Sequence, residues 1–339
     1  MLHQHGAIRG GVVFGPGTSG EIRIDGTESP DAGLVGDARD PVPGSLPRSG
    51  RRVRYSEMAP RPVGRAGGDT GVIARLELER LDDYQSWRIG CGGQQLLIDP
   101  WLVDDLQVGG GGRWLRRRHG LPVALRPGQV SVHDIVVLTS ALPAHAHVAT
   151  LRALDRGVRI LGAQRAVRLA RSLGFRSSIV LTPGQRIVLD GRVALTGIRP
   201  RFPFGMSSLG MLIESLEDGV RTYFEPHVAP LRHPLLEPSV DVIVAPVQKV
   251  RLAGVQLAMD VDESVRLARY LKARWLLATG TAPAAGEGIL PERLLRVDGD
   301  PDTFEAVTRL QLGDGRGRLL APGEVVRVPP RRRRSRPAA

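Results

Sequence analysis

Apolar and polar residues alternate where the first clear pattern of the chain begins. Residues 71–81 alternate as a half-buried strand does, and 86–93 and 94–102 continue as further strands joined by glycine-rich turns. The pattern therefore predicts that a β-meander opens the fold. The next segment, 104–134, contains a run of glycines and is interpreted as a mobile covering loop.

Short apolar runs and helical patterns alternate along the rest of the chain. Strands are expected at 134–140, 158–162, 177–198 (three strands), 208–226 (a hairpin), 240–247 and 275–280. Helices are expected at 146–157, 163–174, 260–274, 288–297 and 301–312. Two facing sheets with helices outside them would bury one face of every element. The predicted fold class is therefore α/β, a four-layer αββα sandwich.

The two ends of the chain differ in composition from its middle. Residues 1–69 are rich in Gly, Pro, Arg and Asp without a sustained period, which predicts disorder. Met58 is an alternative start, which leaves open whether residues 1–57 belong to the native protein. The folded domain is expected at 70–329, followed by a basic disordered tail at 330–339.

The positive charge is concentrated at the C-terminus. The chain carries a formal net charge of +12, and Arg331–Arg336 contains five arginines and no acidic residue. Such a run attracts nucleic acid without sequence preference, so we expect weak non-specific binding there. The alternative interpretation is a solvated tail, since no aromatic residue lies among these arginines to stack on bases.

One cysteine limits the redox chemistry and the metal chemistry of the chain. Cys91 excludes an intramolecular disulfide and a cysteine-based zinc site, and its apolar surroundings predict a buried, inert thiol. The sequence contains no run of about eighteen apolar residues, so no membrane span is predicted. The N-terminus lacks the pattern of a signal peptide, so a cytoplasmic location is expected.

Several segments together resemble the metallo-β-lactamase superfamily. They include the Asp-Pro turn in 96–102, the strand, loop and helix of 134–154, and the strand end at 221–227. The segments 240–247 and 262–280 are similar to the closing strands and helix of that family. The resemblance is nearest to the branch of ascorbate-6-phosphate lactonase and N-acyl-phosphatidylethanolamine phospholipase D, in a divergent plant and cyanobacterial subgroup. It implies a sandwich of metallo-β-lactamase type and a metal-dependent hydrolase.

The metal-binding motif of that family is degenerate in this chain. The family pattern T-H-x-H-x-D-H aligns with Thr139, but Ser140 and Leu142 replace its first two histidines and Ala144 replaces its aspartate. His145 alone matches a ligand. The two later metal histidines of the family have no counterpart either. Methyl groups cannot coordinate a cation, so the usual metal site is not expected to form.

A rearranged site is one interpretation of the histidines that remain. His145 and His147 are two residues apart in an expected loop, and Glu225 and His227 have the same spacing at a strand end. These four residues would form an acceptable ligand set for one zinc or iron ion. Asp99 and His145 are the predicted catalytic residues, with Asp99 in contact with a ligand. In the alternative interpretation, the histidines only stabilise loops by hydrogen bonds.

Two functions follow from these alternatives. In the first, a metal-bound water hydrolyses a small ester, lactone or phosphodiester, which the family resemblance implies. In the second, the chain is a catalytically inactive member that binds no metal and recognises a small ligand or a partner. The first predicts stoichiometric metal, and the second predicts a protein whose stability is indifferent to chelators.

Overall fold

The computed structural model describes residues 76–201, 203, 207–230, 232–236, 240–281 and 286–329. These residues lie within the domain predicted at 70–329. The expectations for 1–69, for Met58 and for the Arg331–Arg336 tail concern residues outside this part of the chain.

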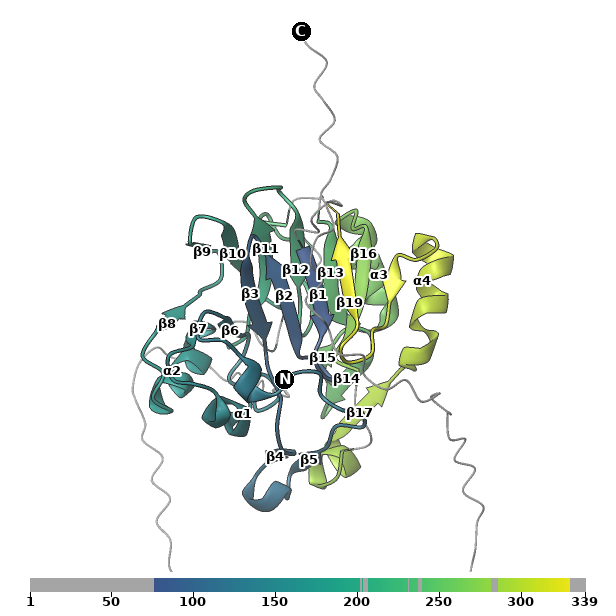
Figure 1. Ribbon diagram of the computed structural model, residues 1–339. Helices are drawn as coiled ribbons and strands as arrows, with labels where there is room; N and C mark the ends of the chain where they lie inside the picture. Colours follow the sequence, from purple (N-terminus) through teal and green to yellow (C-terminus); the bar gives the residue numbers. More distant parts are fainter. Residues whose placement is uncertain are drawn as a thin grey trace, which may run out of the picture. The chain divides into compact units, whose positions relative to one another are not determined.

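Two mixed sheets form the centre of the fold (Figure 1). The first sheet runs in the spatial order β19 (Val325–Val328), β1 (Leu76–Arg80), β2 (Trp87–Cys91), β3 (Gln94–Ile98), β6 (Ile135–Leu138), β7 (Arg159–Gly162), β8 (Ser178–Val180). The second runs β18 (Gly317–Arg318), β16 (Trp275–Thr279), β13 (Val242–Pro246), β12 (Arg221–Phe224), β11 (Gly210–Ser215), β10 (Val193–Ile198), β9 (Arg186–Leu189). The predicted meander is confirmed, because β1, β2 and β3 pair antiparallel in sequence order.

The helices lie outside the sheets. They are α1 (Val148–Ala153), α2 (Gln164–Ser172), α3 (Val261–Tyr270) and α4 (Phe304–Leu312). Figure 1 shows α1 and α2 beside β6–β8, α3 beside β16, and α4 next to α3. The described residues thus form the predicted α/β sandwich with the layer order αββα, which confirms the expected fold class.

Apolar residues of both sheets make the core between them. Its members include Leu78, Ile89 and Val137 of the first sheet and Leu195 and Val244 of the second, all buried. A second cluster packs α3 against the outer face of β13 and β16. One polar contact also crosses the sandwich, where the Trp87 indole N–H donates to Thr279 Oγ1 at 2.9 Å. The sheets are therefore held face to face mainly by apolar burial.

Several strands were not expected from the sequence. The segment taken for a mobile loop contains the hairpin β4 (Leu106–Val108) and β5 (Leu115–Arg117). A three-stranded sheet contains β15 (Val255–Ala258), β14 (Lys249–Leu252) and β17 (Leu295–Asp298). The helix expected at 288–297 is only a π-helical turn at Leu290–Leu294 followed by β17. Pairing of β17 with β14 there overrides the local helical pattern.

Short 3-10 turns complete the described elements. They are η1 (Gly110–Gly112), η2 (Pro127–Gln129) and η4 (Pro301–Thr303). Over the described residues, no helix combines the length and the apolar character needed to cross a membrane. Cys91 lies in the core as predicted, and burial raises the pKa of its thiol to about 12. The expected burial of the thiol is thus confirmed, and its raised pKa favours the protonated form, which is the less reactive one.

Helix α3 begins with a capping box, which provides a stability prediction. Asp260 accepts a hydrogen bond from the Glu263 N–H at 2.8 Å, and Glu263 accepts one from the Asp260 N–H at 3.1 Å. Asp260→Ala is expected to lower the free energy of unfolding by about 1–2 kcal/mol, measured by urea denaturation. Asp260→Asn, which keeps a capping oxygen, should retain most of that stability. Equal losses in the two variants would contradict this role of the cap.

Candidate functional site

Asp99 organises the loop that follows β6. It lies immediately after β3 with φ of 46° and is fully buried. Its carboxylate accepts a hydrogen bond from the Thr139 backbone N–H at 2.7 Å and another from the Thr139 hydroxyl. His145 Nδ1 lies 2.7 Å from Asp99 Oδ2. A carboxylate at this distance favours the tautomer with the proton on Nδ1, in which the Nε2 atom of His145 is an acceptor.

Glu225 lies at the end of β12 and turns back on its own strand. Its Oε2 accepts a hydrogen bond from the Tyr223 hydroxyl at 2.6 Å, and its Oε1 accepts one from the His227 N–H at 3.0 Å. A Cβ at Gly210 would lie 2.7 Å from Oε2, so only glycine leaves room for the carboxyl group. Burial raises the pKa of Glu225 to about 7. At neutral pH, this buried carboxyl group at the edge of the sheet is therefore close to half protonated.

His227 joins His145 at this edge. The two imidazole rings have their centroids 4.6 Å apart, at an interplanar angle of 61°. Both rings are buried. The pKa of His227 lies well below its usual value, because burial and the neighbouring His145 both disfavour the charged form. The structure therefore brings together two of the predicted ligands as a close pair, and His227 is neutral at neutral pH.

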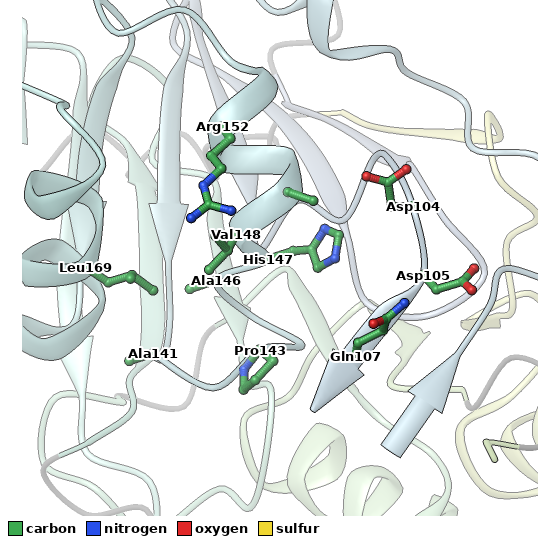
Figure 2. A pocket seen from close by; sticks show the side chains of 11 residues that line it. Asp104, Asp105, Gln107, Ala141, Pro143, Ala146, His147, Val148, Arg152 and Leu169 are labelled. Carbon is green, nitrogen blue, oxygen red and sulfur yellow. The ribbon is translucent and has the colours of Figure 1, made fainter. Parts of the chain in front are cut away.

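His147 lies elsewhere. It is the N-cap of α1, and its Nδ1 is 3.0 Å from Thr150 Oγ1. Figure 2 shows its ring in a cavity that neither His145 nor His227 lines, close to the side chains of Asp104 and Gln107. Burial lowers the pKa of this imidazole. His147 thus caps the start of α1, and its ring is not grouped with the His145–His227 pair.

The predicted four-residue metal set is therefore not assembled. Among the described residues, no three His, Cys, Asp or Glu side chains are grouped so that they could hold a metal ion. The His145–His227 pair offers two imidazoles, while both Glu225 oxygens already accept hydrogen bonds from within its own strand end. The side chains present here do not fit the ligand set of the family's metal centre, which needs at least three ligands.

A cavity of about 250 Å³, named here the histidine pocket, opens beside this pair. Its polar lining residues include His145, His227, Tyr84 and Arg117. Apolar side chains complete the wall, among them Leu106, Val108, Leu115, Leu142, Leu252 and Leu290. Because apolar side chains predominate and a few polar groups converge, the cavity has the make-up of a small-ligand site.

Sequence reasoning missed Arg117 and Tyr84. Arg117 comes from β5, inside the segment that was interpreted as a mobile loop, and Tyr84 lies in the turn between β1 and β2. The available signal was the apolar residue that begins each strand of this hairpin. These residues are Leu106 and Leu115, and both line the pocket. The glycine run between these strands obscured the strand pattern.

Comparison with solved structures reveals the same fold in several hydrolases. An isothiocyanate hydrolase from Delia radicum gut bacteria matches with 15% identity and a TM-score of 0.58, over 74% of this chain and 98% of that chain. A possible metal-dependent hydrolase from Veillonella parvula matches with 13% identity and a TM-score of 0.56, over 75% and 99%. At such identities the likeness shows the fold alone.

The same fold also occurs in a beta-hydroxylase, and a match to a family model identifies the family of this chain. CmlA, a diiron beta-hydroxylase from Streptomyces venezuelae, matches with 14% identity and a TM-score of 0.51, over 75% of this chain and 54% of that chain. A search of curated protein sequences found no match. The model described as the beta-lactamase superfamily domain matches residues 82–280. Since this match covers more than half of the chain, the protein belongs to the beta-lactamase superfamily.

Proposed function

We propose that this chain is a ligand-binding member of the superfamily and that the histidine pocket takes up a small, largely apolar molecule. One observation carries the proposal. Leu142 and Ala144, which occupy metal-ligand positions of the family pattern, both line the histidine pocket. The change that removes two metal ligands therefore also gives the pocket two apolar wall residues, which favour an apolar ligand over a hydrated cation.

Metal content and chelator sensitivity test this proposal. We expect the purified full chain to contain no stoichiometric zinc, iron or manganese by elemental analysis. Its melting temperature should change by less than about 1 °C in EDTA, because a metal bound only to the folded state would contribute stability that chelation removes. About one metal ion per chain, lost in both His145→Ala and His227→Ala together with a fall in melting temperature, would overturn the proposal.

A second candidate function rests on the contact between Asp99 and His145. This pair, with 2.7 Å between Oδ2 and Nδ1, orients an imidazole whose Nε2 is able to accept a proton from water. Such a general base is suited to hydrolysis of an ester, lactone or phosphodiester in the pocket. Turnover of an ester by the EDTA-treated protein, abolished by His145→Ala, would support this candidate over ligand binding alone.

A further inference from the structure

The residues that line the histidine pocket include no lysine, aspartate or glutamate, and among them Arg117 is the one arginine. Its side chain is buried, with 7% of the residue exposed, and its Nε atom has no hydrogen-bond partner. The guanidinium carbon lies 5.4 Å from the centroid of the Tyr84 ring, which favours the cation but accepts none of its N–H groups in a conventional hydrogen bond. A buried guanidinium N–H that lacks a hydrogen-bond acceptor is costly, so this group calls for a ligand.

Other arginines in the described residues show how the fold satisfies such groups. Arg80 is also buried, but its guanidinium donates to the carbonyl oxygens of Asp82 and Leu320 at 2.9 and 2.8 Å. The neighbours of Arg117, Arg116 and Arg118, both pair with Asp105. Within the part of the chain that the structure describes, no ion pair links Arg117 to a carboxylate. Arg117 thus differs from its neighbours, because it lines the pocket and pairs with no carboxylate of the described residues.

A neighbouring segment of the chain packs against Arg117. Gly286 lies directly against it, since a Cβ at that glycine would come within 3.2 Å of Arg117 Cγ and Nε. An isolated bridge between Arg116 and Glu287 ties this segment to β5. The guanidinium is therefore pre-positioned, which lowers the entropic cost of binding an anion.

We propose that the histidine pocket binds a small carboxylate with an apolar tail, and that Arg117 binds its head group. This inference deepens the proposed function and rests on it. A guanidinium pairs with a carboxylate through two parallel hydrogen bonds. One cation matches a singly charged head group, whereas a phosphate monoester would bring excess negative charge among apolar side chains. The volume of about 250 Å³ lies just below the roughly 300–1,000 Å³ of common ligand sites, which suits a short tail.

Calorimetric titration of the full chain with octanoate and octanamide tests the proposal. The two probes have tails of equal length and differ in head-group charge. We expect octanoate to bind roughly 10- to 100-fold more tightly than octanamide, the effect of hydrogen bonds to a charged group. In Arg117→Met the octanoate affinity should fall by that factor while the octanamide affinity stays unchanged. Arg118→Met, which changes the exposed arginine directly after β5, should alter neither affinity.

The outcomes separate the two proposals. If octanamide binds as well as octanoate and Arg117→Met alters neither, the role of Arg117 is overturned and the apolar pocket stands. If neither probe binds at millimolar concentration, the proposed function itself is overturned. Tighter binding of octyl phosphate than of octanoate would overturn the choice of a carboxylate. The comparison of octanoate with octanamide uses the unaltered chain, so it tests the proposed carboxylate specificity even if Arg117→Met fails to fold.

Discussion

Replacing Asp99 with alanine is expected to lower the free energy of unfolding by about 3–5 kcal/mol. The carboxylate accepts two hydrogen bonds from Thr139 and contacts His145 Nδ1, all in fully buried surroundings. Alanine would leave the Thr139 backbone N–H without an acceptor, and the Thr139 hydroxyl and His145 Nδ1, which lie 3.0 Å apart, would keep only each other as partners. Each buried unsatisfied donor costs about 1–3 kcal/mol, and the loss of the buried side chain adds to this. Urea denaturation monitored by circular dichroism measures the loss.

A matched control separates these hydrogen bonds from backbone strain. Asp104 has φ of 53°, close to the 46° of Asp99, but its side chain is exposed. Asp104→Ala therefore places alanine in the same left-handed region without removing buried bonds, and should cost about 1 kcal/mol or less. Asp99→Asn, which keeps one acceptor oxygen, should fall between the two. Similar losses in Asp99→Ala and Asp104→Ala would show that the carboxylate contributes no stability of its own.

The layer order was predictable because buried strands and capped helices leave strong local patterns. Ile135–Leu138 and Val242–Pro246 are buried at every position, and both were expected as strands from their continuous apolar runs. Asp260 and Glu263 mark the start of α3 in the sequence and form its capping box in the structure. The strands of the small sheet were missed because they are only partly buried, as the burial of Lys249–Leu252 illustrates, and their apolar positions form no clear period.

The candidate site was predictable only in part, for a geometric reason. His145 and His227 approach each other because β6 and β12, in opposite sheets, end at the same edge of the sandwich. The argument from spacing failed for His147, since residues two apart share a face in a strand but not where a loop enters a helix. His147 instead caps α1. The role of Arg117 could not be predicted from the sequence. Only the tertiary fold shows that its side chain lines a cavity and that no carboxylate of the described residues pairs with it.

Replacing Glu225 with glutamine is expected to remove a pH-dependent loss of stability. The pKa of this carboxyl group is raised by burial to about 7, from an ordinary value of 4.5. The folded state therefore binds the proton more tightly than the unfolded state does. Its contribution is fully present below about pH 4.5 and is lost as the pH rises through about 7. The shift corresponds to about 3 kcal/mol between these limits.

Glutamine resembles the protonated acid, since its amide group can donate to the Tyr223 oxygen while its carbonyl accepts from the His227 N–H. Glu225→Gln should thus match the unaltered chain near pH 4 and exceed it by about 3 kcal/mol at pH 8. Urea denaturation across this range measures the difference, and Glu292→Gln, in an exposed glutamate, serves as the control. A difference between Glu225→Gln and the unaltered chain that stays constant from pH 4 to 8 would mean that Glu225 keeps an ordinary pKa. The buried carboxyl would then be held charged by its two hydrogen bonds, and burial would not be the dominant influence on its proton.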